Sequence, residues 1–374
     1  MPAFFAHPPD VDEDAAQRLA RDLYGLDAVA SALPSERDRN FRLDTADGAR
    51  GVLKIANARE TTDMLEAENA AMRHLAATRL TPVLVPTRAG GDIGVSGEYR
   101  VRLITWVDGE PLAVARARTS GLLESVGSAV AVVDVALESF DHPALHREFH
   151  WDLAAARATI ARELPRVADP DLRRAIDHFL SLHDFSVVPR LATLARSVIH
   201  NDANDHNVLV DCRTDRVVGI VDFGDMVFTE TVNGLAVAMA YAALGEGRPL
   251  IAAASVARGY QAVRPLTDDE LAVLFPLMGL RLCVSAVVAC VQQAERPGDE
   301  YLGVSQRAIR EALPRLADIH PRLAHYILRE ACGVTPVPEA GAVPSRGAIS
   351  TEPASVTTPA SMPCARSQRP SSPG

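Results

Sequence analysis

Two short motifs near the middle of the chain constrain its fold more than any other feature. Residues 200–207 read HNDANDHN, and residues 220–224 read IVDFG. Between them, 208–210 and 217–221 are rich in β-branched side chains and are separated by a polar turn at 211–215. The sequence therefore predicts a β-hairpin that holds the two polar motifs side by side.

The spacing of the polar residues is typical of phosphoryl-transfer sites. In that chemistry an Asp positions the attacking hydroxyl and accepts its proton, while an Asn and a second Asp ahead of Phe-Gly bind a metal ion. Asp202, Asn207 and Asp222 have this spacing. Mg²⁺ prefers amide and carboxylate oxygens, so Asn207 and Asp222 are its predicted ligands and Asp202 stays with the hydroxyl. We expect His200 to brace the loop; an ordinary surface hairpin with polar ends is the competing interpretation.

A lysine inside an apolar stretch supports a nucleotide site. Residues 52–55, Val-Leu-Lys-Ile, read as a strand, and a buried ammonium at Lys54 is costly unless an anion such as a nucleotide phosphate meets it. A predicted helix over 63–75 carries Glu66 and Glu68, either of which could pair with the lysine. The alignment of this helix with the motif favours Glu68, and two solvated glutamates are the alternative.

The turn ahead of the lysine strand is the predicted phosphate loop. Residues 33–42 read LPSERDRNFR and contain no glycine. Backbone amides, Ser35 and the guanidinium of Arg39 could still bind phosphate. An exposed polar hairpin is the alternative.

A predicted strand after the helix marks the junction between two lobes. Residues 99–107 alternate as a strand that ends at Asp-Gly-Glu-Pro. We expect backbone groups from Leu103 to Val107 to hold the nucleotide base. Because backbone contacts do not depend on side-chain identity, the sequence does not separate ATP from GTP.

Candidate acceptor-binding residues are dispersed. Trp151 and Asp152 could bind a cationic amine through ring face and carboxylate, or be a core tryptophan and a helix-capping aspartate. The apolar run 271–291 is interrupted by a proline and Arg281, which favours a buried helix over a membrane span. A buried guanidinium requires a carboxylate, from an amino-acid substrate or from a protein side chain. Two motif carboxylates complete the set: Asp205 and Asp225.

Six segments resemble the aminoglycoside phosphotransferase and choline kinase superfamily: SERDRNF, VLKI, EFHWDL, HNDANDHN, IVDFGDMVF and HPRLAHYILREACG. The similarity covers most of residues 10–335. It is strongest to hydroxylysine kinases and to the kinase domain of bacterial fusions that end in a class III aminotransferase. One departure is Gly234, where many members carry an Asp that braces the catalytic loop; glycine also weakens a helix by about 1 kcal/mol relative to alanine.

The resemblance implies an α+β, protein-kinase-like fold with a small β-rich N-lobe and a larger helical C-lobe. It further implies Mg²⁺-dependent transfer of the γ-phosphate of ATP or GTP to the hydroxyl of a small amino alcohol, 5-hydroxylysine above all. An aminoglycoside, ethanolamine-like or homoserine-like acceptor is the alternative within the enzyme class. A catalytically silent domain that binds a ligand is the alternative outside it.

Amino-acid composition and its change along the chain predict the domain boundaries. The N-lobe is predicted at 1–107, the C-lobe at 108–333, and a disordered tail rich in Pro, Ser and Ala at 334–374. The formal net charge of −10 argues against nucleic acid as a partner. Five cysteines without CxxC spacing, and no secretory leader at the start, predict reduced thiols in the cytoplasm. The tail could replace the further domains of the fusion relatives.

Overall fold

The computed structural model describes residues 8–35, 37–295 and 306–337. The chain divides into two units, 1–336 and 337–374, and every element below belongs to the first. The predicted disordered tail lies almost wholly outside the described residues.

The first part of the chain forms an antiparallel sheet with the strand order β1-β2-β3-β6-β4, and β5 pairs with β6. The strands are β1 (Ala28–Leu33), β2 (Arg39–Thr45), β3 (Arg50–Ile55), β4 (Leu84–Val85), β5 (Gly94–Ser96) and β6 (Tyr99–Thr105). The register places Lys54 of β3 opposite Asn40 of β2 on one side and opposite Arg102 of β6 on the other. Since side chains of directly opposed residues share a face, these three polar residues lie on the same face of the sheet.

Alternation along the strands gives the sheet two different faces. Phe41, Leu53 and Leu103 belong to an apolar cluster that packs against helix α1 (Glu13–Leu19) and the π-helical turn at Ala20–Tyr24. The opposite face contacts helix α2 (Thr62–His74), which begins at an N-cap where Thr61 Oγ1 accepts from the Met64 N–H. The polar face of the sheet is therefore turned toward α2.

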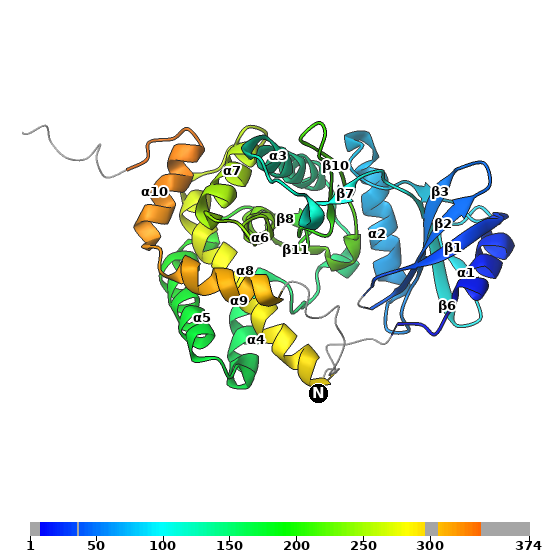
Figure 1. The fold of residues 1–374 in the computed structure, drawn as a ribbon, viewed down its shortest axis with the longest axis horizontal. Helices are drawn as coiled ribbons and strands as arrows, with labels where there is room; N and C mark the ends of the chain where they lie inside the picture. Colours follow the sequence, from blue (N-terminus) through cyan, green and yellow to red (C-terminus); the bar gives the residue numbers. More distant parts are fainter. Residues whose placement is uncertain (1–7, 36, 296–305, 338–374) are drawn as a thin grey trace, which may run out of the picture. The chain divides into compact units, whose positions relative to one another are not determined.

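Helices make up most of the remainder: α3 (Ser120–Leu137), α4 (Ala156–Glu163), α5 (Pro170–Leu182), α6 (Val232–Ala242), α7 (Pro249–Gln261), α8 (Asp268–Glu295), α9 (Gln306–Ala317) and α10 (Pro321–Ala331). Every residue of α6 is buried, and α6 contacts α3, α7 and α8 (Figure 1). An antiparallel sheet followed by a helical region is the predicted kinase-like architecture.

Two glycines bring α3 and α7 into backbone contact. A Cβ added at Gly127 would lie 1.8 Å from the Val256 carbonyl oxygen, and one at Gly259 would lie 1.8 Å from the Glu124 oxygen. Only hydrogen atoms fit at these two positions. The two helices are thus held at a distance that any larger side chain would increase.

Two helices, α3 and α8, are long and apolar enough by composition to cross a membrane. In α8 the apolar window is 94% buried inside the protein, against 56% for α3. The buried core helix predicted at 271–291 is confirmed by this burial, and Arg281 lies within it.

The predicted hairpin forms as β9 (Val208–Asp211) and β10 (Arg216–Ile220), with β7 (Glu110–Pro111) added on the β9 side. A Cβ at Gly109 would lie 2.5 Å from Val218, and one at Gly219 would lie 2.6 Å from Val107. The hairpin therefore packs tightly against the chain segment that leaves the sheet. A second pair, β8 (Arg196–Ile199) with β11 (Val227–Glu230), flanks the two motifs.

Gly234 of α6 faces a buried carboxylate from another helix. A Cβ at Gly234 would lie 3.1 Å from Oδ2 of Asp134 on α3, and the Tyr260 hydroxyl donates to the same oxygen at 2.9 Å. An Asp at position 234 would place two carboxylates in contact here, which burial makes costly. Glycine at position 234 therefore leaves room for the buried carboxyl group of Asp134 and places no second carboxyl group beside it.

Candidate active site

The loop after β8 is held by the imidazole of His200. Its Nε2 lies 3.1 Å from the Val221 carbonyl oxygen, its Nδ1 accepts from the Asp202 N–H at 3.2 Å, and its ring meets Phe223 edge-on at 4.7 Å. Burial lowers the pKa of His200 to about 4, so the ring is neutral, with the proton on Nε2. This geometry is that of the predicted brace between the two motifs.

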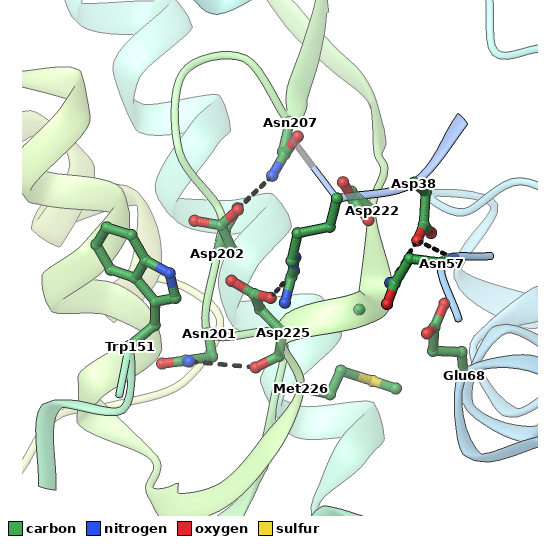
Figure 2. A network of polar contacts seen from close by, with 12 residues as sticks. Asp38, Asn57, Glu68, Trp151, Asn201, Asp202, Asn207, Asp222, Asp225 and Met226 are labelled. Atoms are coloured by element: carbon green, nitrogen blue, oxygen red, sulfur yellow. Dashed lines mark hydrogen bonds and ion pairs between the residues drawn. The ribbon is translucent and has the colours of Figure 1, made fainter. Parts of the chain in front are cut away.

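The carboxylate of Asp202 is surrounded by donors. Asn207 Nδ2 donates to its Oδ2 at 2.7 Å and Asn204 Nδ2 at 3.0 Å, and Figure 2 shows the Asn207 amide directed at Asp202. Arg281 Nη2 donates to Oδ1 at 2.8 Å. Burial and the nearby charge of Asp225 raise the pKa of Asp202, and Arg281 acts in the opposite direction. The carboxylate predicted to pair with the buried guanidinium of Arg281 is therefore a protein side chain, that of Asp202.

The two predicted metal ligands lie next to each other. The Val221 N–H donates to the Asn207 backbone oxygen at 2.9 Å, which joins the ends of the hairpin. Asn207 uses its amide nitrogen on Asp202, so its side-chain oxygen remains for another partner, and Asp222 adds a carboxylate. One amide oxygen and one carboxylate suit a hard cation such as Mg²⁺. Among the described residues no cluster of three or more His, Cys, Asp or Glu could hold a metal.

Two of the four described non-glycine residues with positive φ lie at the same place. Asn201 and Asp222 both have positive φ, 62° and 66°, a conformation that L-residues adopt rarely and that glycine adopts freely. Asn201 Nδ2 donates to the Asp225 backbone oxygen at 3.1 Å, as Figure 2 shows. Such strain persists where surrounding contacts enforce it, and it aims the Asp202 and Asp222 side chains.

Lys54 pairs with Asp222 rather than with the glutamate favoured from the sequence. Its Nζ lies 3.2 Å from Asp222 Oδ1, whereas Glu68 accepts from Arg102 at 2.8 Å. Arg102 lies directly opposite Lys54 in the sheet and forms the ion pair with Glu68 in its place. The sequence pattern does not reveal this pairing. Burial alone would lower the pKa of Lys54, but Asp222 and Glu68 more than offset it and the pKa is raised. The pKa of Asp222 is held low, chiefly by Lys54. Glu66 is exposed.

A cavity of about 490 Å³ brings most of the candidates together. It is lined by the following predicted residues: Ser35, Lys54, Glu68, Trp151, Asp202, Asn207, Asp222, Asp225 and Arg281. Asp225 forms an ion pair with Arg37, and the Trp151 ring lies 4.7 Å from the Arg281 guanidinium. The cavity thus joins the lysine strand, both motifs and α8.

The side chains of Arg39, Leu103 and Val107 do not line the cavity. Arg39 shares the face of Phe41, and its Nε donates to the Val11 oxygen, because it is one residue out of phase with Asn40 on the polar face. Leu103 pairs with β3 and β4 inside the sheet and is part of the apolar cluster. Val107 packs on Gly219 of the hairpin. The guanidinium of Arg39 is thus turned away from the cavity, while the base contacts predicted for backbone groups between Leu103 and Val107 do not depend on side chains and stay a prediction.

Two carboxylates predicted to meet the acceptor bind protein groups outside the cavity. Asp205 forms a buried ion pair with Arg118 at 3.0 Å, whose guanidinium also donates to carbonyl groups at the end of α6. Asp152 caps a short helical turn through the Ala154 N–H and accepts from Thr229 at 2.9 Å. Neither lines the cavity. Asp152 is therefore the capping aspartate of the competing interpretation.

Several cavity residues were missed from the sequence. Arg37 lies in the predicted phosphate loop, two positions before Arg39, and Asn204 lies inside the HNDANDHN motif. Asp38 Oδ1 accepts from the Asn57 N–H at 3.0 Å and fixes this loop to the end of β3 (Figure 2). Tyr241 and Gln306 come from α6 and α9, and no local pattern marks them.

Comparisons with known proteins identify the family to which the chain belongs. Residues 29–268 match the family described as "Phosphotransferase enzyme family". The hydroxylysine kinase of Xenopus laevis is 30% identical over 343 residues, covering 83% of this chain and 91% of the relative.

Solved structures share the fold at low identity. An amicoumacin kinase in complex with AMP-PNP, Ca²⁺ and amicoumacin superposes with a TM-score of 0.62 at 13% identity, over 83% of this chain and 96% of that one. A microcompartment-associated aminopropanol kinase gives a TM-score of 0.58 at 18% identity, over 86% and 99%. The chain is thus a member of the phosphotransferase enzyme family with the kinase-like fold, a small-molecule kinase that phosphorylates an alcohol group.

Proposed function

We propose that this protein transfers the γ-phosphate of ATP or GTP to the hydroxyl of a small amino alcohol, 5-hydroxylysine above all. The observation that carries the proposal is the arrangement of Asp202, Asn207 and Asp222 around one cavity with Lys54. The 30% identity to a hydroxylysine kinase over most of both chains supports the acceptor. The AMP-PNP complex of the amicoumacin kinase supports an adenine nucleotide as donor.

The proposed reaction assigns a role to each motif residue. Asp202 orients the acceptor hydroxyl and takes its proton while the hydroxyl oxygen bonds to the γ-phosphorus. The bond from that phosphorus to the bridging oxygen breaks, and the nucleoside diphosphate leaves. Lys54 binds the phosphates, and His200 keeps the Asp202 loop in place.

Asn207 and Asp222 would hold Mg²⁺ in this reaction. When bound, the ion would neutralise charge on the phosphate oxygens. The protein's part is to keep both ligands in fixed positions, through the Asn207 amide on Asp202 and the Lys54 ion pair on Asp222. The low pKa of Asp222 keeps that ligand ionised.

The acceptor's side-chain amine is assigned to Asp225 and the Trp151 ring. Asp225 is a buried carboxylate on the cavity wall, and an ammonium group would share it with Arg37. The Trp151 ring offers an apolar surface with a negative face to a cation. Both residues line the same cavity as Asp202.

The test is an acceptor panel. The purified chain is incubated with Mg²⁺, ATP or GTP and, separately, 5-hydroxylysine, ethanolamine, choline, homoserine and kanamycin, with product read by mass spectrometry. The proposal predicts phosphorylated 5-hydroxylysine. Phosphorylation of kanamycin or ethanolamine instead would give the chain a different acceptor, and nucleotide binding without any product would identify a silent domain.

A further inference from the structure

Two buried polar atoms on one wall of the cavity lack hydrogen-bond partners among the described residues. They are Nε of Arg281, a residue 1% exposed, and Oε1 of Gln306, a residue 9% exposed. Both residues line the cavity. A buried polar atom without a partner is costly, so an orphaned donor and an orphaned acceptor in one cavity indicate a ligand that carries the complementary groups.

The two atoms belong to one connected group of side chains. Arg281 and Ser285 are one helical turn apart on α8 and therefore adjacent on its surface. Gln306 Nε2 donates to the Ser285 backbone oxygen at 3.4 Å, and the Ser285 hydroxyl lies 2.8 Å from that of Tyr241. With the amide nitrogen committed to a carbonyl group, Oε1 is the atom that Gln306 can offer to a ligand.

Arg281 is held in a fixed plane. Its guanidinium lies 4.7 Å from the Trp151 ring and 5.6 Å from the Tyr241 ring. Nη1 donates to the Trp151 oxygen at 2.9 Å, and Nη2 donates to Asp202 at 2.8 Å. Nε is the nitrogen that remains, and its natural partner is a carboxylate, because charge-assisted hydrogen bonds are the strongest that guanidinium makes.

The complementary chemistry is that of an α-amino acid. A carboxylate satisfies Arg281 Nε, and an ammonium group satisfies Gln306 Oε1. We propose that Arg281 and Gln306 form a receptor for the zwitterionic α-ammonium and α-carboxylate head of the acceptor. This inference rests on the proposed function only in placing the acceptor's hydroxyl at Asp202.

Binding of unreactive probes tests the receptor without turnover. L-lysine carries the whole head but no hydroxyl, cadaverine lacks the carboxylate, and 6-aminohexanoate lacks the α-ammonium. By calorimetry with the full chain, L-lysine is expected to bind about tenfold or more tightly than either probe. Equal affinity for L-lysine and cadaverine in the unmodified protein would overturn the proposal without any variant.

Variants of Gln306 then test the ammonium half of the head. Gln306→Leu should bring L-lysine affinity down to that of 6-aminohexanoate, and Gln306→Met is the alternative if the first variant does not fold. Gln293→Leu, at an exposed position of α8, is the matched control and should leave L-lysine affinity unchanged. L-lysine affinity that is unaffected in folded Gln306→Leu would contradict the role of Gln306.

The outcomes separate the two proposals. If L-lysine binding depends on Gln306 but no hydroxylated amino acid is phosphorylated, the proposed receptor stands. The proposal that 5-hydroxylysine is the acceptor of the kinase is then wrong. Phosphorylation of 5-hydroxylysine and of its decarboxylated analogue with equal kcat/KM would keep the kinase assignment and remove the receptor.

Discussion

Arg281 Nη2 donates to Asp202 Oδ1 at 2.8 Å, and this ion pair connects the longest buried helix to the loop that carries the proposed catalytic residue. Arg281 is almost fully buried, so each charge of the pair depends on the other. The pair makes α8 part of the active site.

Removing the arginine alone should therefore be severe. Arg281→Met leaves Asp202 without its cation in a buried position, and we expect the free energy of unfolding to fall by about 3–5 kcal/mol. In urea denaturation, adding Asp202→Asn to Arg281→Met should recover part of that loss. Losses that simply add in the double variant would show that the two charges are not coupled.

We expect Asp222 both to bind the metal ion and to form the ion pair with Lys54. Asp222→Asn removes a charged ligand and the partner of Lys54, and we expect kcat/KM to fall about 100-fold or more, with a higher Mg²⁺ concentration needed for half-maximal rate. Asp211→Asn, at the far end of β9 where the carboxylate accepts from Arg213, is the control and should retain wild-type kinetics. An unchanged Mg²⁺ requirement in Asp222→Asn would remove the assignment of that residue as a ligand.

Asp134 should make stability depend on pH. Burial raises its pKa to about 7, so between about pH 4 and pH 7 the unfolded chain releases this proton while the folded protein keeps it. The folded state binds more protons in that window, so this carboxyl's contribution to stability is complete below about pH 4 and is lost as the pH rises through 7. The slope reaches at most about 1.4 kcal/mol per pH unit.

Comparison with Asp134→Asn isolates that contribution. Urea unfolding at pH 5, 6, 7 and 8 should show wild-type stability falling relative to the variant as the pH rises. Asp177→Asn, at an exposed position of α5, is the control. Parallel pH profiles for wild type and Asp134→Asn would contradict a buried, protonated Asp134.

The close approach of α3 and α7 gives a test of the fold. Gly127→Ala places a methyl group 1.8 Å from the Val256 oxygen and must separate the helices, so we expect a loss of at least about 2 kcal/mol. Gly121→Ala on the same helix meets its nearest atoms at 3.8 Å and should be neutral or up to about 1 kcal/mol more stable. Thermal unfolding of the two variants should move in different directions; equal Tm values would contradict the helix contact.

The sequence predicted what depends on local pattern. Alternating β-branched residues located the hairpin, and motif spacing selected Asp202, Asn207 and Asp222, because neighbours in the chain are neighbours in such a turn. The sequence does not separate Arg37 from Arg39, because Arg37 lies in a turn, where side chains have no fixed alternation, while Arg39 is the first residue of β2.

Long-range pairings lay beyond the sequence pattern. Arg102 takes Glu68 because the register of β3 and β6 places it beside Lys54, and only the folded sheet defines that register. The apolar run around Arg281 predicts a buried cation, but no sequence pattern identifies its partner, Asp202, which lies 79 positions away. Gln306 carried no sequence signal at all.

The most direct test of the account is Asp202→Asn, which keeps the shape of the side chain and removes the base. We predict that nucleotide affinity, measured by calorimetry with Mg²⁺, stays within about twofold of wild type, and that phosphorylation of the acceptor falls by at least about 100-fold. A variant that phosphorylates the acceptor near the wild-type rate would contradict the assignment of Asp202, and with it the proposed active site.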